Sequence, residues 1–232
     1  GTHVAHFANP DTARLILLPE LLGLGEAGMR VSVLTGRSPR ADEVRQYGLP
    51  VKTIPFTRRM SPFQDLRTLI AAIRYLRKVK PTILHTHNPK PNLIGTLAAR
   101  LAGVPIIINT VHGRYVRPGM PLILRWAMAI FERIELRMAS RVLVLNEEDA
   151  ASFHRYGGEP DRVVYLGGGI DLDRFDPGHF SASDIARRRG QLGIPPGNLV
   201  IGTVGRLVRE KGYTELVEAL RTVIQDIPHL TL

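Results

Sequence analysis

Residues 82–113 read TILHTHNPKPNLIGTLAARLAGVPIIINTVHG, which is a short apolar run, a longer amphipathic run and a second short apolar run. The short runs, 82–85 and 105–109, are rich in β-branched residues and do not alternate strictly, as is typical of parallel strands covered on both faces. Apolar residues of 91–102 recur at helical spacing, and Gly103 closes that helix. Because parallel neighbours need a crossover helix, the segment predicts one strand–helix–strand unit of an open parallel sheet.

The same alternation extends over about the first 165 residues. Further strands are expected at 3–7, 30–35, 51–55, 141–145 and 162–166. Further helices are expected at 11–27, 62–79, 121–139 and 147–156. A G-x-G-x-x-G sequence at 23–28 ends a helix and precedes a strand, the reverse of a dinucleotide-binding context, so it is interpreted as a helix-closing turn. The predicted fold class is α/β, a doubly wound parallel sheet of the Rossmann-like type.

The pattern changes after residue 167, where a glycine run is followed by several Asp and Pro residues and a basic helix candidate at 183–192. A strand at 198–204 and a helix at 212–225 then begin a second Rossmann-like domain. Since this domain stops after its first unit, the chain is expected to be incomplete. The predicted division is a first domain, a linker with a helix, and the start of a second domain, at 1–167, 168–197 and 198–232.

The composition excludes several classes of site. With no cysteine, the chain has no disulfide framework, thiolate metal site or cysteine nucleophile. The formal net charge of +10 favours an anionic partner, which phosphate, nucleic acid or an acidic membrane surface would supply. No run reaches the ~18 uncharged apolar residues of a membrane-spanning helix, and the first residues lack a signal-peptide pattern. A cytoplasmic protein, soluble or peripheral to the membrane, is therefore expected.

A basic loop with glycine follows the expected strand at 198–204. Gly205 and Arg206 begin this loop, Arg209 lies within it, and Lys211 comes directly before the helix at 212–225. In doubly wound folds, ligands bind at the carboxyl ends of the strands, where helix N-termini present free N–H groups. The pattern indicates a diphosphate site, with a polar turn carrying solvated cations as the alternative.

Three histidines are candidates for chemistry. His85 and His87 lie two apart at the end of an expected strand, so their side chains point the same way toward a metal or a substrate. His112 ends the next strand before Gly113, which suits contact between a neutral imidazole and a substrate hydroxyl. Hydrogen bonding at strand ends is the alternative. Because residues 81–130 contain no Asp or Glu, a carboxylate ligand would have to come from elsewhere, and no metal is predicted.

Two segments suit an anionic membrane surface. Residues 58–80 carry seven basic side chains and one acidic side chain, Asp65. The helix expected at 121–139 combines Trp126 and other apolar residues with three arginines. These patterns predict peripheral contact with the inner face of the plasma membrane. The alternatives are a solvated charged face for the first segment and core packing for the second.

Several motifs, taken in order, resemble one family. Those of the first domain are HTHNPK at 85–90, NLIGTLAARLA at 92–102, GVP at 103–105 and NTVHG at 109–113. They resemble the N-terminal domain of glycosyltransferase family 4, and most of all bacterial enzymes of cell-surface polysaccharide synthesis. GGID at 168–171 resembles the N-G-I-D turn that ends this domain, with glycine in place of Asn. GRL at 205–207 and KG at 211–212 resemble the start of the family's donor domain.

This resemblance implies a GT-B fold, an acceptor-side domain followed by a donor-side domain, and transfer from a nucleotide-diphosphate sugar with retention. It implies that Gly205, Arg206 and Lys211 bind the diphosphate and that the catalytic residue, His112, faces the donor sugar. The acceptor cleft would contain Asn9, His85, His87, Asn88, Lys90 and Gly113. The acceptor would be lipid-linked or a saccharide, the sugar a hexose or an N-acetylhexosamine, and neither cofactor nor metal is implied.

Two features depart from the family pattern. The loop at 8–12 is not the glycine-rich turn that many members use. The family's paired distal glutamates would lie beyond Leu232, so the chain alone is expected to be inactive.

Two other functions stay open. A metal-dependent hydrolase would use His85, His87 and His112 and would retain metal through purification. A polyanion-binding module would use the +10 charge and bind with a steep salt dependence. However, Phe63 and Tyr75 are the only aromatic residues of 58–80, too few for a stacking platform, and no nucleic-acid partner is predicted.

Overall fold

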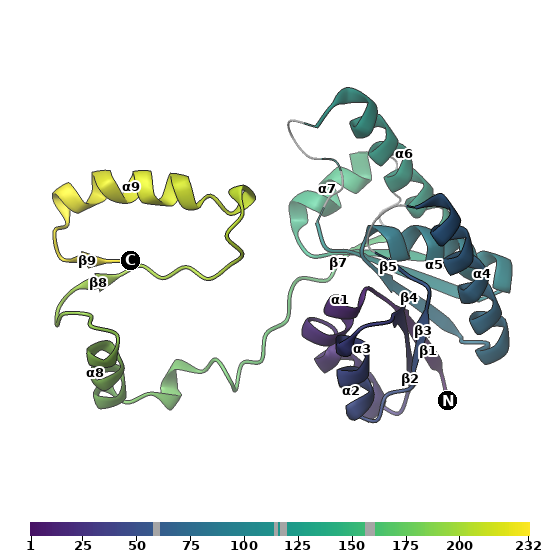
Figure 1. Ribbon diagram of the computed structural model, residues 1–232, viewed down its shortest axis with the longest axis horizontal. Helices are drawn as coiled ribbons and strands as arrows, with labels where there is room; N and C mark the ends of the chain where they lie inside the picture. Colours follow the sequence, from purple (N-terminus) through teal and green to yellow (C-terminus); the bar gives the residue numbers. More distant parts are fainter. Residues whose placement is uncertain (58–60, 114–115, 117–119, 156–160) are drawn as a thin grey trace. The chain divides into compact units, whose positions relative to one another are not determined.

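The computed structural model describes residues 1–57, 61–113, 116, 120–155 and 161–232. The chain divides into two compact units, Gly1–Gly168 and Gly169–Leu232, which are described separately (Figure 1). None of the described helices is long and apolar enough to cross a membrane.

The first unit is built on a seven-stranded sheet in which every pair of neighbours is parallel. Its strands are β1 (His3–Phe7), β2 (Arg30–Gly36), β3 (Val51–Ile54), β4 (Ile83–His87), β5 (Ile106–Val111), β6 (Arg141–Val144) and β7 (Val163–Tyr165). Their order is β3-β2-β1-β4-β5-β6-β7, so the chain moves outward from β1, returns to β4 beside it, and moves outward in the other direction. The doubly wound fold is confirmed, and its topological switch point lies between β1 and β4.

Helices cover both faces of this sheet (Figure 1). They are α1 (Pro10–Leu15), α2 (Leu18–Glu26), α3 (Pro39–Gln46), α4 (Pro62–Val79), α5 (Pro89–Ala102), α6 (Leu122–Met138) and α7 (Glu147–Arg155). Two buried apolar clusters hold them: Val33 of β2 belongs to the cluster with residues of α1–α3, and its neighbour Leu34 belongs to the cluster with residues of α4–α7. Successive strand residues point to opposite faces, so the two clusters lie on opposite sides of the sheet.

The approach of α5 to the sheet depends on Gly95, which the motif NLIG supplies. A Cβ at this position would lie 2.7 Å from Thr86 Cγ2 and 2.9 Å from Phe7 Cδ1. Because neither neighbour is the free end of a flexible side chain, any larger residue must push the helix away from β1 and β4.

Three local expectations are wrong or incomplete. The helix expected at 11–27 is two helices, because Pro19 lacks an N–H and its ring would clash with the carbonyl of Leu15 in a continuous helix. Helix α3 was not expected, because only Ala41 and Val44 face the core and so short a segment shows no clear periodicity. Strand β4 continues to His87, which pairs with Thr110, although the sequence pattern ended it at 85. The last residue of the helix expected at 147–156 lies outside the described residues.

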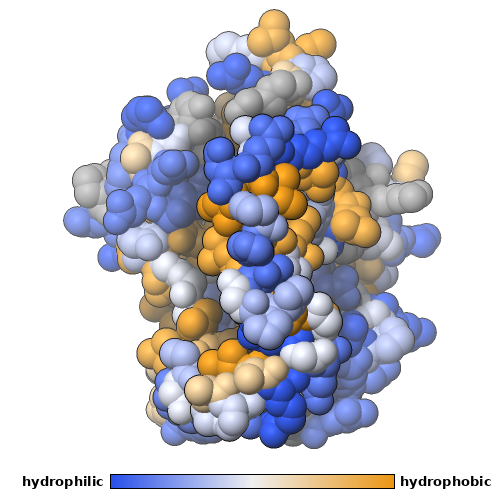
Figure 2. All heavy atoms as spheres, turned by 90° about the vertical axis from the view of Figure 1, so that its left-hand side faces the viewer, coloured by the Kyte–Doolittle hydropathy of each residue, from blue (hydrophilic) through white to orange (hydrophobic). Residues whose placement is uncertain are grey.

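The second unit has little regular structure. It contains η1 (Pro177–His179), α8 (Ala182–Gln191), β8 (Leu199–Val200), η2 (Arg209–Lys211), α9 (Tyr213–Asp226) and β9 (Leu230–Thr231). A capping box between Ser181 and Asp184 starts α8. The strand expected at 198–204 is shorter, because its one partner in the described residues, β9, pairs with Leu199 and Val200 only. Figure 2, which faces this unit, shows apolar side chains between hydrophilic ones on its surface; Val204 and Leu207 are among those exposed.

Candidate functional site

Polar side chains collect where β1, β4 and β5 end, which is where doubly wound folds bind ligands. Asn9 follows β1, while Asn88 and Lys90 follow β4 and begin α5. His112 and Gly113 follow β5. The structure therefore brings the predicted acceptor-side residues to adjacent strand ends.

Asn9 and Asn88 join the loops on either side of the switch point. Asn9 is buried; its Oδ1 accepts a hydrogen bond from the backbone N–H of Thr12 (2.9 Å), which caps α1. Asn9 Nδ2 donates to Asn88 Oδ1 (2.8 Å). Asn88 has φ +79°, a value uncommon for residues other than glycine. The side-chain bond thus helps to hold a strained loop in one conformation.

Lys90 is tied into the protein. Its side chain is buried, and Nζ donates to the carbonyl oxygen of Thr57 (2.8 Å) and pairs with Asp65 Oδ1 of α4 (2.5 Å). A buried ammonium needs such a partner, since an unpaired charge away from water is costly. The charge of Lys90 therefore connects α5 to α4, and only part of its side chain lines the neighbouring pocket.

This neighbouring pocket, of about 350 Å³, is mainly apolar. It is lined by Asn9, Phe56, Asn88, Pro89, Lys90, Pro91, Leu93, Met128 and Phe131. It lies beside the Asn9–Asn88 bridge, so a ligand would meet amide groups at one edge and aliphatic or aromatic side chains elsewhere.

Four histidine rings lie close together and are named here the histidine cluster: His6, His85, His87 and His112. His6 Nδ1 is 3.2 Å from His87 Nε2, and the ring centroids of His85 and His87 are 4.0 Å apart. The centroids of His87 and His112 are 5.6 Å apart. His6 was not singled out from the sequence. The strand register explains its position, because His6 lies directly opposite His85 across the switch point.

Burial lowers the pKa of three rings of the histidine cluster: His6, His87 and His112. It is the largest cause that lowers the pKa of His6 and of His87 well below the usual value, and the neighbouring His85 lowers both further. The pKa of His112 is also lowered, first by burial and then by His85, with Glu20 acting in the opposite direction. These three imidazoles are therefore neutral near pH 7, and each keeps a lone pair for a hydrogen bond or a ligand.

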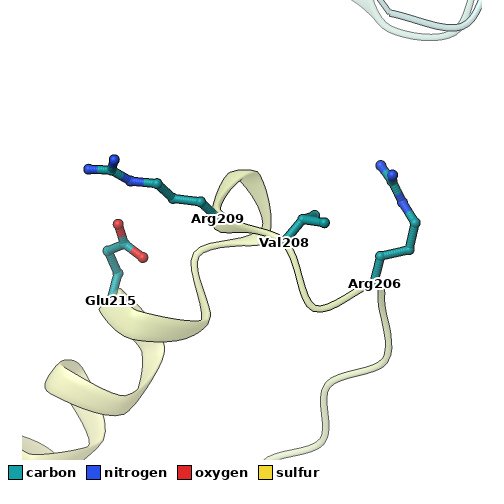
Figure 3. Close-up of a pocket in the computed structure, with 4 residues that line it drawn as sticks. All are labelled: Arg206, Val208, Arg209 and Glu215. Atoms are coloured by element: carbon teal, nitrogen blue, oxygen red, sulfur yellow. The ribbon is translucent and has the colours of Figure 1, made fainter.

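In the second unit, the loop before α9 presents cations from a glycine-containing backbone (Figure 3). A Cβ at Gly205 would lie 2.8 Å from the hydroxyl of Tyr213. Gly212, with φ +69°, precedes α9 and supplies no side-chain cap, so the first N–H groups of the helix are not capped by that residue. An open pocket is lined by Arg206, Val208, Arg209 and Glu215; in Figure 3 the Arg206 side chain extends upward from the loop, whereas that of Arg209 extends away from it, to a position above Glu215.

The outcome for the three predicted diphosphate residues is mixed. Arg206 lines this pocket, and Gly205 lies beside it in the chain. Lys211 belongs to η2 and is not among the lining residues, whereas Arg209, another cation of the same loop, is. Residues 201–204 are not a strand, so Gly205 does not follow the strand directly, as the sequence pattern predicted.

Residues 21–169 match the family described as glycosyl transferase 4-like domain. The chain belongs to this family. It is 30% identical to an Escherichia coli UDP-Gal:alpha-D-GlcNAc-diphosphoundecaprenol alpha-1,3-galactosyltransferase, over 80% of this chain and 46% of that protein. It is 27% identical to the Staphylococcus aureus capsular polysaccharide biosynthesis glycosyltransferase CapM, over 78% of this chain and 48% of that protein. The chain thus spans about half the length of these curated relatives.

Solved structures show the same fold. A glycosyltransferase from Rickettsia africae matches with a TM-score of 0.73 at 18% identity, over 96% of this chain and 57% of that one. The Anabaena protein HepE, solved with UDP and glucose, matches with a TM-score of 0.73 at 20% identity, over 100% of this chain and 60% of that one. The glycosyl transferase 4-like chain therefore has the α/β architecture of GT-B glycosyltransferases.

Sequence reasoning on this glycosyl transferase 4-like chain missed a carboxylate as well as His6. Glu20 of α2 reaches the histidine cluster, with Oε1 3.4 Å from His85 Nδ1. The lack of acids in 81–130 was the ground for predicting no metal, and the fold supplies an acid from another segment. In the sequence, the only indication of where Glu20 lies was that the amphipathic run at 11–27, which contains it, precedes β2, the strand that pairs with β1.

Proposed function

We propose that this chain forms the acceptor side and the start of the donor side of a glycosyltransferase. The enzyme would move a hexose or N-acetylhexosamine from a nucleotide-diphosphate sugar to a lipid-linked or saccharide acceptor. The observation that carries the proposal is the Asn9–Asn88 bridge at the switch point of a sheet from this family, with His112 following β5, the strand next to β4. The relatives from Escherichia coli and Staphylococcus aureus, which are named for such transfers, support it.

Arg206 is the proposed anchor for the donor diphosphate, with Gly205 allowing close backbone approach and Lys211 adding positive charge. When the sugar leaves, negative charge develops on the diphosphate oxygens, and cations already in place stabilise that charge. The N-terminus of α9 adds the positive end of a helix dipole to the same loop. HepE, the Anabaena protein solved with UDP and glucose, supports this donor class.

His112 is the proposed catalytic residue, and Gly113 and His85 and His87 are proposed to border the substrate. A neutral imidazole can accept a hydrogen bond from a sugar hydroxyl without repelling the cationic character that develops at the anomeric carbon. Gly113 has φ +115° and open space where a Cβ would lie, so a substrate can approach the backbone there. Transfer with retention belongs to this proposal.

The acceptor is proposed to enter beside the Asn9–Asn88 bridge, with an apolar portion in the pocket lined by Leu93, Met128 and Phe131. Exposed apolar side chains on α4 and α6, including Phe63 and Ile123, would rest on an anionic membrane at its cytoplasmic face. The basic residues expected there at 58 and 59 lie outside the described residues.

The test is the affinity of the natural protein that contains these residues for a panel of nucleotide-diphosphate sugars. Arg206→Ala should weaken binding of the preferred donor at least about tenfold, as the loss of a charge-assisted contact would. The control is Arg221→Ala, an exposed arginine on α9, which should leave affinity unchanged. Equal affinity of Arg206→Ala and wild type would remove the diphosphate role, and enzymic turnover by the 232-residue chain alone would contradict its expected inactivity.

A further inference from the structure

Four side chains from three separate elements meet at the switch point on the face of the sheet covered by α2. We call them the switch-point ligands: His6 of β1, Glu20 of α2, and His85 and His87 of β4. One ligand atom of each lies within 4.8 Å of one ligand atom of every other. We propose that the switch-point ligands bind one zinc ion. The proposal shares His85 and His87 with the proposed substrate border, but its test is separate from that of sugar transfer, because zinc binding is measured without any nucleotide sugar.

The spacing of the ligand atoms suits a tetrahedral ion. Zinc bonds of roughly 2.0–2.1 Å at tetrahedral angles place neighbouring ligand atoms about 3.3 Å apart. His6 Nδ1 and His87 Nε2 are 3.2 Å apart, and His85 Nδ1 and Glu20 Oε1 are 3.4 Å apart. Two opposite edges of the tetrahedron are therefore already near their final length, and small side-chain rotations would bring the two pairs together.

The contacts around His85 have the form expected of a metal ligand. His85 Nε2 is 2.7 Å from Thr110 Oγ1 on β5, which leaves Nδ1 facing Glu20. Metal-binding histidines commonly donate their other ring N–H to a neighbouring oxygen, and this bond sets the tautomer and the ring orientation. Thr110 is thus placed to orient His85 for an ion on its Nδ1 side.

Hydrogen bonding and packing alone do not account for the cluster. In the described part of the chain, buried His6 Nε2 and His87 Nδ1 have no hydrogen-bond partner. Each of these outer nitrogens is desolvated without repayment, which is a cost that a purely structural ring would not normally carry. An ion bound at the opposite, facing nitrogens, His6 Nδ1 and His87 Nε2, would contribute binding free energy that offsets this cost.

This ligand set favours zinc over the alkaline-earth cations. Imidazole nitrogens and one carboxylate suit zinc, whereas Mg²⁺ and Ca²⁺ prefer oxygen ligands. Glu20 is exposed, which gives an ion a path from solvent, and its carboxylate would close the site.

The experiment measures zinc binding by the natural, tag-free protein after treatment with EDTA. Equilibrium dialysis with elemental analysis should find one Zn²⁺ per chain, and Mg²⁺ should not compete. Co²⁺ in place of zinc should give the intense visible absorption of a tetrahedral site. Thermal unfolding should shift to higher temperature with zinc, because a ligand bound only to the folded state stabilises it.

The decisive variant is Glu20→Gln, which keeps the shape of an exposed side chain and so should fold normally by circular dichroism. It should weaken zinc binding at least about tenfold and change the cobalt spectrum. Glu26→Gln, also exposed on α2, is the matched control and should bind like wild type. Absence of zinc binding by the wild type, equal affinity in Glu20→Gln, or equal binding of Mg²⁺ would each overturn the proposal.

Discussion

The two units of this chain hold their candidate residues by different means. In Gly1–Gly168, seven parallel strands and two buried apolar clusters position the side chains at the switch point. In Gly169–Leu232, none of the residues whose burial is described is buried, and the strands pair over two residues each. Core packing therefore orders the first site, whereas the loop that carries Arg206 is held by short-range backbone hydrogen bonds, such as that from Val208 N–H to the Arg206 carbonyl oxygen (2.8 Å).

The largest contrast should come from truncating one leucine in each unit. Leu84 of β4 is fully buried and Leu207 is 89% exposed. Leu84→Ala should lower the free energy of unfolding by about 2–5 kcal/mol through lost burial and a residual cavity. Leu207→Ala should change it by less than about 0.5 kcal/mol. Urea unfolding measures both, and similar losses would mean that the second unit has a core that the structure does not show.

A glycine pair tests whether close packing at the switch point is as strict as the distances indicate. Gly95→Ala places a Cβ within 3 Å of Thr86 and Phe7 and should cost about 1–3 kcal/mol of unfolding free energy. Gly25→Ala on α2 meets no atom within 4 Å and should be neutral or stabilising by up to about 1 kcal/mol, because alanine favours helix. Chemical denaturation compares the two, and a neutral Gly95→Ala would show that α5 can move away from the sheet.

The smallest expected effect is a dependence of the unfolding free energy on pH, which arises from His3 in the first unit. Burial, and then the charge of Arg30, lower the pKa of His3. Arg30 donates to His3 Nδ1 (2.9 Å), and His3 Nε2 lies 2.8 Å from Ser32 Oγ. The stabilisation from neutral His3 is fully present above the unfolded pKa of about 6.5 and is lost as pH falls through the lower folded value.

Comparing wild type with His3→Gln isolates this contribution. Between pH 7 and pH 5 the unfolding free energy of His3→Gln should fall less steeply than that of wild type. The two slopes should differ by at most about 1.4 kcal/mol per pH unit. Urea unfolding at several pH values gives the slopes. Identical slopes for the two proteins would mean that His3 takes up a proton as easily in the folded state as in the unfolded chain.

Much of the first unit could be predicted from the sequence because its signals are local. Continuous β-branched runs, helical apolar spacing and a Pro at a helix start depend only on neighbouring residues, and α4 (Pro62–Val79) begins and ends where the pattern predicts. The predicted helices were wrong where a local signal competes with another or is weak. Pro19 divides a periodic run into α1 and α2, and α3 is too short for its periodicity to stand out.

The sequence by itself determined the parallel α/β fold, the motifs of the glycosyl transferase 4-like family and the common direction of His85 and His87, because these follow from backbone periodicity and residue order. Only the tertiary structure placed His6 opposite His85 and brought Glu20 to the same point. Only the tertiary structure likewise shows that Lys90 forms an ion pair with Asp65 of α4. Strand order and helix docking bring together residues far apart in the chain, and no local pattern encodes those contacts.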